Sequence, residues 1–146
     1  MTAPQAHSTS SIEQCLLITL PRHHHDNGNL TVVENKQEVP FAIRRLYYLY
    51  DVPSGEERGG HSHIDCCEFI VAASGSFDVE IFDGRDRRTV TLNRPNIGLL
   101  VTSGIWRVLN NFSSGSVCLV MASMPFDEND YVRDFDSFLS LTSAKR

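Results

Sequence analysis

Hydrophobic and polar positions alternate along most of this chain with the period of two that is typical of β-strands. Between residues 77 and 82, Phe77, Val79 and Ile81 alternate with Asp78 and Glu80, which predicts one buried and one wet face. Glycine, proline and asparagine turns separate similar segments at regular spacing, which predicts an all-β sandwich or barrel. About nine strands are expected, at 15–20, 30–34, 41–52, 69–73, 77–82, 88–92, 97–101, 105–109 and 117–122.

The segment 41–52 is the longest of these runs and is rich in aromatic and branched residues. Its alternation places Ile43, Arg45, Tyr47 and Leu49 on one face of the predicted strand. An arginine that alternates with apolar residues is a better candidate for an inward-facing cation than one that follows a turn. Arg45 is therefore a candidate for a binding site, and Tyr47 shares its face.

The C-terminal part of the chain has a helical period instead. A short amphipathic helix is expected to begin after Asp130, a candidate N-cap, and to pack against the barrel. Its apolar positions are Tyr131, Val132, Phe135, Phe138 and Leu139.

The length of 146 residues fits one domain, which we expect at 12–140, with tails at 1–11 and 141–146. The net charge of -5 argues against non-specific binding of nucleic acid, which needs a basic face. No apolar run approaches the length of a membrane span, so no membrane partner is expected, and the first eleven residues do not have the pattern of a signal peptide. Four cysteines without a zinc-type spacing favour reduced thiols in the cytoplasm.

The most informative motif lies between Gly55 and Gly75 and has the spacing G-x5-H-x-H-x4-E-x6-G, which is that of the first motif of cupin β-barrels. His61 and His63 are two residues apart, so on a strand they project from the same face. Glu68 follows at the start of the next apolar run. Two imidazoles and a carboxylate can hold a metal or transfer a proton, which predicts an enzyme site.

A second segment, 102–111, matches a cupin motif that often supplies a histidine ligand, but Arg107 stands in the histidine's place. A guanidinium has no lone pair for a metal and repels divalent cations. We therefore expect no metal and no cofactor, while an open triad of His61, His63 and Glu68 stays as an alternative.

Other polar clusters have simpler interpretations. Three consecutive histidines at 23–25 cannot all face one centre in an extended chain, so a solvated loop at 22–28 is expected. Arg85, Arg87 and Arg88 follow a hairpin turn and are interpreted as surface residues. Trp106 is interpreted as a core or pocket-wall residue.

Several runs of the chain together resemble the dTDP-sugar 3,4-ketoisomerase family of small cupins, over about residues 15–138. These runs are VPFAIRRLYYLYDVPSGEERGGHSH, SGSFDVEIFDG, LNRPNIGLLV, IWRVLNNFSSGSVCLVMAS and DENDYVRDFDSF. The resemblance implies a cupin-type jelly-roll barrel that isomerises dTDP-4-keto-6-deoxy-glucose to a 3-keto sugar in deoxysugar biosynthesis. It also implies a domain-swapped homodimer that needs no metal.

The family's catalytic R-G-G-H-x-H segment maps onto residues 58–63, and its site-lining tyrosine maps onto Tyr47. The chain departs from the family at Ser62 and Ile64, where alanine and lysine are usual, and at Glu68, where glutamine is more frequent. Asn27 and Gly28 stand where the family has an arginine-glycine pair. The first of these positions and Arg107 are expected to border the sugar, so the configuration at C4 of the product stays open.

The resulting hypothesis is an isomerisation through an enediol, for which histidine has a suitable pKa. His61 is expected to take the C3 proton, His63 to manage the proton at the C4 oxygen, and Tyr47 to orient His61 or shuttle a proton. The remaining candidates are expected to bind substrate, and they are Arg45, Arg58, Arg107, Asn27, Trp106 and Arg133. Two alternatives are a metal-dependent cupin enzyme and a non-catalytic cupin that binds a nucleotide sugar.

Overall fold

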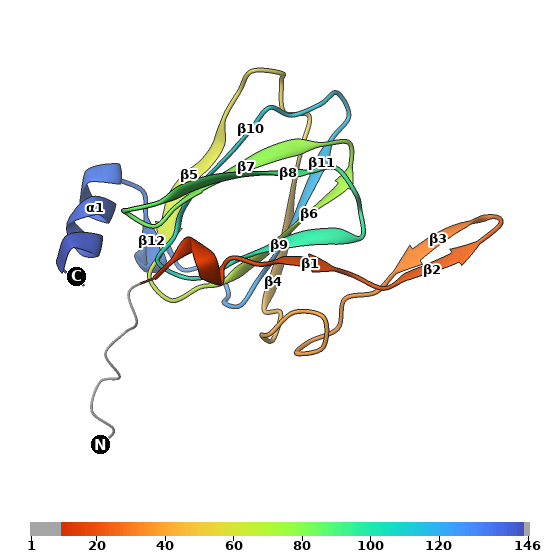
Figure 1. The fold of residues 1–146 in the computed structure, drawn as a ribbon, viewed down its shortest axis with the longest axis horizontal. Coiled ribbons are helices and arrows are strands. Elements are labelled where there is room, and N and C mark those ends of the chain that lie inside the picture. Colours follow the sequence, from red (N-terminus) through yellow and green to blue (C-terminus); the bar gives the residue numbers. More distant parts are fainter. Residues whose placement is uncertain (1–9, 145–146) are drawn as a thin grey trace.

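The computed structural model describes residues 10–144, which form two antiparallel five-stranded sheets that face each other (Figure 1). The first sheet has the order β1 (Leu17–Thr19), β9 (Ile97–Val101), β6 (Glu68–Ser74), β11 (Val117–Ala122) and β4 (Arg45–Tyr50). The second has the order β12 (Tyr131–Val132), β5 (Arg58–His63), β10 (Trp106–Asn110), β7 (Phe77–Phe82) and β8 (Arg87–Leu92). The predicted all-β fold of the cupin type, with a short C-terminal helix, is confirmed.

The core lies between the sheets because each strand turns its apolar positions inward. On β7, Phe77, Val79 and Ile81 are buried, while Asp78 and Glu80 are half-buried on the other face, as the alternation predicts. Burial of such side chains is the main term that stabilises a small sandwich, at roughly 25 cal/mol per Å² of apolar surface.

Strand β4 forms one edge of the first sheet and shows the predicted alternation. Arg45, Tyr47 and Leu49 point inward and are half-buried. The outer face carries three large exposed side chains, Leu46, Tyr48 and Tyr50. The expected strand at 41–52 is therefore correct in type, although its ordered pairing is confined to residues 45–50.

Residues 22–28 were expected to be a polar loop, and this expectation is wrong. They belong to a hairpin of β2 (Arg22–His25) and β3 (Gly28–Thr31), which projects from the body on the side opposite the C-terminal helix (Figure 1). Asp26 and Asn27 form its turn, a pair that tolerates the backbone angles of a two-residue connection. The three histidines of β2 are exposed, so their predicted solvation is confirmed.

The C-terminal helix begins later than the apolar period predicts. Residues 128–130 form a short 3-10 turn (Glu128–Asp130), and Tyr131 and Val132 form β12, which pairs with β5. The helix α1 runs over Phe135–Ala144, and Asp134 caps it by accepting a hydrogen bond from the backbone N–H of Ser137 at 2.9 Å. Asp130 cannot cap this helix because its carboxylate binds groups around His63.

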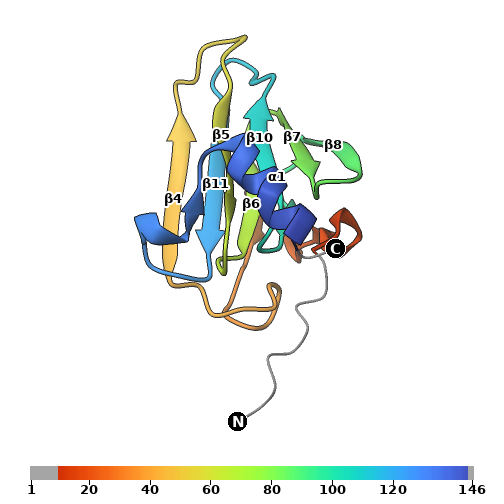
Figure 2. The same ribbon diagram turned by 90° about the vertical axis from the view of Figure 1, so that its left-hand side faces the viewer.

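Helix α1 lies against the second sheet (Figure 2), where its Phe138 is buried. Helix α1 extends into the expected tail at 141–146 and includes residues 141–144. At the other end, residues 1–9 of the expected tail lie outside the described residues, and Ser11 caps a 3-10 turn at Ile12–Gln14. None of the described helices is long and apolar enough to cross a membrane.

Candidate active site

The inward faces of both sheets bring the predicted site residues together at one side of the sandwich. On the second sheet, His61 of β5 is the direct partner of Arg107 of β10, so both side chains point into the interior. On the first sheet, Arg45 of β4 and Glu68 of β6 both lie opposite Ala122 of β11. These side chains surround a cleft of about 380 Å³ whose lining includes Arg45, Tyr47, Leu49, Arg58, Gly59, His61, Arg107, Phe126, Tyr131 and Arg133.

An ion pair between Glu68 and Arg107 forms the floor of this site. Arg107 donates from Nε to Oε1 of Glu68 at 2.6 Å and from Nη2 to Oε2 at 3.2 Å. Tyr47 donates its hydroxyl hydrogen to Oε2 of Glu68 at 2.5 Å and accepts a hydrogen bond from Nη2 of Arg107 at 2.8 Å. The hydroxyl of Tyr47 is thus held by this pair, and no hydrogen bond joins it to His61 among the described residues, so the structure offers no contact for the expected orienting role.

Charge compensation decides the protonation of these three residues. Burial disfavours the Glu68 carboxylate, but the guanidinium of Arg107 outweighs burial and lowers the pKa of Glu68 to about 2. Burial also opposes the charge of Arg107, yet the Glu68 carboxylate raises the pKa of Arg107 above its usual value. Burial raises the pKa of Tyr47. At neutral pH the cluster is a carboxylate, a guanidinium and a neutral phenol.

Gly59 makes room for this arginine. Its φ of 69° lies in the left-handed region, and its carbonyl oxygen accepts a hydrogen bond from Nη1 of Arg107 at 3.3 Å. A Cβ at this position would overlap Nη1 of Arg107. The position of the Arg107 guanidinium therefore requires a glycine at position 59.

His61 lines the cleft and is 5% exposed. Burial, and then the charge of Arg107, lower the pKa of His61 to about 3, so the imidazole is neutral near pH 7. Its Nε2 is buried and has no hydrogen-bond partner among residues 10–144. The lone pair of this neutral imidazole is free to accept a proton at the edge of the cleft, although the lowered pKa makes His61 a weaker base than free histidine.

His63 lies beside His61, with the two rings edge to face and their centroids 4.8 Å apart. Burial lowers the pKa of His63, although the Glu68 carboxylate and Asp130 act in the opposite direction. Its Nδ1 lies 3.0 Å from Oδ2 of Asp130, and its Nε2 is buried without a hydrogen-bond partner in the described part of the chain. His63 lines a second, smaller cavity of about 150 Å³ beneath α1.

Tyr131 of β12 covers both imidazoles, with centroid distances of 4.9 Å to His61 and 4.4 Å to His63. Its hydroxyl accepts a hydrogen bond from Nη2 of Arg45 at 3.1 Å. Arg133 lies 4.2 Å above the ring of Tyr131, and its guanidinium pairs with Glu128 on the surface. Arg45 and Arg133 therefore hold this aromatic residue at the mouth of the cleft.

Two residues that were predicted to bind substrate, Trp106 and Asn27, do not line the cleft. Trp106 precedes Arg107 on β10, so it points to the opposite face of the sheet and packs against Phe135 and Phe138 of α1, with centroids 5.1 and 5.6 Å away. Trp106 therefore does not line the cleft of its own chain, and its interpretation as a core residue fits this packing. Asn27 lies at the turn of the projecting hairpin and does not line the cleft of its own chain.

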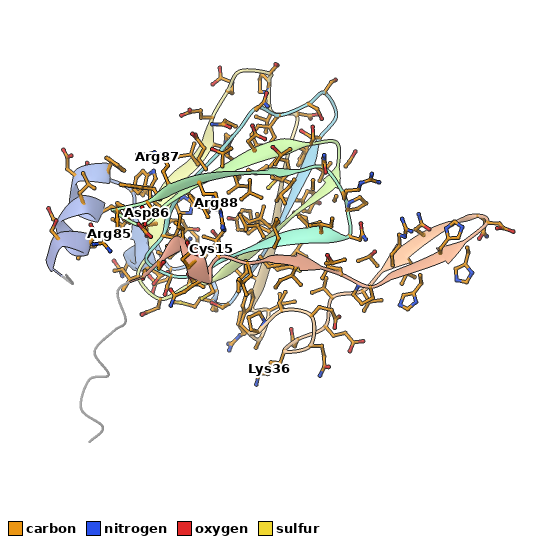
Figure 3. All side chains as sticks on the ribbon, in the orientation of Figure 1. Cys15, Lys36, Arg85, Asp86, Arg87 and Arg88 are labelled. Carbon is orange, nitrogen blue, oxygen red and sulfur yellow. The ribbon has the colours of Figure 1, made fainter. Side chains whose placement is uncertain are left out.

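The arginines at 85–88 were interpreted as surface residues, and the structure gives them local roles. Figure 3 labels them, and Arg88 lies beside Cys15, whose carbonyl oxygen accepts a hydrogen bond from Nη2 of Arg88 at 2.6 Å. The guanidinium of Arg87 covers the ring of Phe82 at 4.3 Å. None of these arginines lines the cleft among the described residues.

The triad of His61, His63 and Glu68 has its possible ligand atoms within 4.8 Å of one another, as does a second group of His63, Cys66 and Asp130. The first group does not fit a metal ion, because Arg107 and Tyr47 bind both oxygens of Glu68. A guanidinium at that distance would also repel a divalent cation.

Three residues at this site were not predicted from the sequence, namely Phe126, Asp130 and Tyr131. Phe126 lines the mouth, where the guanidinium of Arg45 lies 5.5 Å from its ring. Tyr131 was assigned to the apolar face of a helix because it falls on the helical period. No local signal distinguishes a two-residue strand, because its pairing with β5 is a tertiary contact.

Comparisons with known proteins identify relatives of this chain. The family model described as "FdtA: WxcM-like, C-terminal" matches residues 13–143. A curated relative, the TDP-4-oxo-6-deoxy-alpha-D-glucose-3,4-oxoisomerase of Aneurinibacillus thermoaerophilus, is 38% identical over 111 residues, which are 76% of this chain and 80% of the relative.

Three solved structures have the same fold. A 3,4-ketoisomerase from Helicobacter canadensis is 37% identical with a TM-score of 0.87, covering 89% of this chain and 98% of its own. The sugar 3,4-ketoisomerase QdtA from Thermoanaerobacterium thermosaccharolyticum, solved in complex with TDP, is 30% identical with a TM-score of 0.90, covering 92% and 98%. A histidine-to-asparagine variant of QdtA was solved with TDP-4-keto-6-deoxyglucose, at 31% identity and a TM-score of 0.87, covering 89% and 94%.

Proposed function

This chain belongs to the TDP-sugar 3,4-ketoisomerase family, and we propose that it converts TDP-4-keto-6-deoxy-glucose to a TDP-3-keto-6-deoxy-hexose by histidine acid–base catalysis. It is thus an isomerase of deoxysugar biosynthesis. The observation that carries the catalytic part is the state of His61, which is neutral, lines the cleft and has a buried Nε2 without a hydrogen-bond partner among the described residues.

The reaction removes a proton from C3 and adds a proton to C4, without a net change in the redox state of the sugar. Nε2 of His61 takes the proton from C3, and the electron pair of the C3–H bond forms the C3–C4 double bond while the C4 carbonyl becomes an enediolate oxygen. The proton of the C3 hydroxyl then leaves as the C3 ketone forms, and C4 receives a proton. His63, directly or through one water, exchanges the proton that the C4 oxygen gains when the C4 hydroxyl forms.

The arginines around the cleft differ in whether another residue already compensates their charge. The charge of Arg107 is compensated by Glu68, so its contribution to an enediolate is smaller than its position alone would suggest. Arg45 has a buried Nε without a partner in the described chain and can stabilise the developing negative charge. Arg58 and Arg133 line the mouth, where a diphosphate could reach their guanidinium groups.

The function is tested with chelator-treated protein and TDP-4-keto-6-deoxy-glucose, and the products are identified by NMR. We expect a 3-keto sugar, and the coupling constants at C4 give its configuration. A sugar that stays unchanged with and without added metal, while TDP still binds, would support a non-catalytic binding protein instead. Activity only after addition of a metal would support the triad of His61, His63 and Glu68.

We also propose a domain-swapped homodimer in which the β2–β3 hairpin packs on the partner subunit. An isolated two-stranded hairpin is only marginally stable in water, and this one is exposed on nearly all of its residues. Leu46, Tyr48 and Tyr50 form an exposed apolar face on β4 that such a contact could cover. Asn27 would then approach the cleft of the partner rather than its own.

Light scattering of the intact chain is expected to give the mass of a dimer, and removal of residues 22–31 is expected to shift it toward a monomer. A monomeric intact chain would contradict this arrangement. The four cysteines, at positions 15, 66, 67 and 118, are unpaired, which supports the further proposal that the enzyme works in the reducing cytoplasm.

A further inference from the structure

Asp130 and His63 form a buried pair, of which the proposed mechanism so far uses only the histidine. The carboxylate oxygen Oδ2 lies 3.0 Å from Nδ1 of His63, and the two residues are 6% and 5% exposed. Asp130 also accepts hydrogen bonds from the backbone N–H of Asp65 at 2.8 Å and of Cys66 at 3.2 Å. Three groups, from the last residue of β5 and from the segment that follows it, therefore converge on one carboxylate.

Main-chain hydrogen bonds also hold Asp130 and His63 next to each other. The N–H of Ile64 donates to the carbonyl oxygen of Asp130 at 2.9 Å, and Tyr131 pairs with His63 across β12 and β5. The main chain of Asp130 is thus bound to the residue that directly follows His63. A side chain fixed in this way has little freedom to rotate away from the imidazole.

The chemistry of the two partners determines where the imidazole carries its hydrogen. An ionised carboxylate can only accept hydrogen bonds, so Nδ1 of His63 must be the donor in this pair. In the neutral ring the lone pair is then on Nε2, the buried nitrogen without a partner among residues 10–144. Oε1 of Glu68 lies 3.7 Å from this Nε2, so an imidazolium formed there would lie between two carboxylates.

We propose that Asp130 is a positioning residue that holds His63 with its hydrogen on Nδ1, so that Nε2 is available to exchange a proton during the isomerisation. This inference rests on the proposed ketoisomerase function. His61 has no carboxylate in hydrogen-bond contact among the described residues, so the two histidines are set up differently: His61 is the base at the cleft, and the ring of His63 is held by Asp130.

The test replaces Asp130 with asparagine and uses Asp127→Asn as the matched control. Asp127 is exposed, lies three positions away at the start of the same 3-10 turn, and accepts a hydrogen bond from the backbone N–H of Asn129 at 3.0 Å, a role that asparagine also fills. Both variants lose one negative charge, but only Asp130→Asn changes the partner of His63. We expect Asp130→Asn to lower kcat about 100-fold with little change in TDP binding, and Asp127→Asn to leave both unchanged.

A second readout reports the hydrogen position directly and does not depend on activity. In ¹⁵N-histidine-labelled wild-type protein at neutral pH, the ring nitrogens of His63 should show a protonated Nδ1 and an unprotonated Nε2. Asp130→Asn should move the hydrogen to Nε2, because the asparagine amide can donate to Nδ1. If Asp130→Asn does not fold, the wild-type spectrum still decides the question.

Two results would overturn the inference, namely a wild-type spectrum with the hydrogen on Nε2, or a folded Asp130→Asn variant with wild-type kcat. A wild-type enzyme that does not isomerise TDP-4-keto-6-deoxy-glucose would instead overturn the proposed function, whatever the spectrum shows.

Discussion

Arg107 and Glu68 face each other from opposite sheets inside the sandwich, joined by hydrogen bonds of 2.6 and 3.2 Å, and each is at most 2% exposed. A buried pair of this kind is poor evidence for net stabilisation, but removal of one partner leaves the other charge buried without compensation. The pair also occupies both carboxylate oxygens of Glu68, which are then not free to bind a metal ion. Its energetic and functional consequences can both be measured.

Arg107→Met is expected to destabilise the fold by about 3–5 kcal/mol, because it leaves the Glu68 carboxylate buried without its partner. Urea unfolding of wild type and variant measures the difference. The control is Glu128→Gln, which breaks the equally short but exposed pair between Arg133 and Glu128, and which should leave the unfolding midpoint unchanged. If both substitutions lowered the free energy of unfolding equally, burial would not explain the cost of removing Arg107.

Gly59→Ala is expected to destabilise the fold by more than the about 1–2 kcal/mol that a left-handed backbone costs an alanine, because the added Cβ overlaps Arg107. Gly115→Ala is the matched control: its φ of 71° is close to the 69° of Gly59, and no atom lies within 4 Å of a Cβ built there. The difference between the two variants in thermal unfolding isolates the contact with the guanidinium. No difference would show that Arg107 moves aside freely.

Lowering the pH from 7 to 5 should destabilise the protein through His61. Its pKa is about 3 in the fold against 6.5 for the unperturbed group, so within this window the unfolded chain binds a proton that the native state does not. Stability therefore falls as pH falls below 6.5, by about 2 kcal/mol at pH 5 from this group alone. The lowered pKa of His63 acts in the same direction, and that of Glu68 adds to the loss below pH 4.5.

Urea unfolding of wild type and His61→Asn at the two pH values checks this expectation. The variant cannot gain the proton, so its stability should change less between pH 7 and pH 5 than that of the wild type. An equally steep dependence in both proteins would assign the effect to other groups.

Tyr131→Ala should lower kcat about ten- to hundredfold, because both imidazoles lose the ring that packs on them and small displacements of catalytic groups are costly. Tyr131→Phe keeps this packing and removes only the hydrogen bond from Arg45, so it should retain most of the wild-type kcat. Steady-state kinetics of the two variants separates the roles. If the phenylalanine variant were as slow as the alanine variant, the hydroxyl would be the important group.

The sequence predicts the central part of this site because period-two alternation fixes which side chains share a face. It places Arg45 with Tyr47 and His61 with His63, and the structure confirms both pairs as inward-facing. The same rule could have excluded Trp106, since it is adjacent to Arg107 on one strand and must face the other way. Asp130 and Tyr131 could not be found in this way, because their positions depend on a short strand that pairs with β5 over a separation of more than sixty residues.

The most direct test of the proposed chemistry follows the transferred proton. Chelator-treated wild type and His61→Asn are incubated with TDP-4-keto-6-deoxy-glucose in D2O, and the position of deuterium is read by NMR. We expect the wild type to give a 3-keto product with deuterium at C4, and the variant to retain less than about a tenth of the wild-type kcat. A His61→Asn variant that exceeds this level, or a wild-type product without deuterium from the solvent at C4, would contradict the assignment of His61 as a base that exchanges its proton with water.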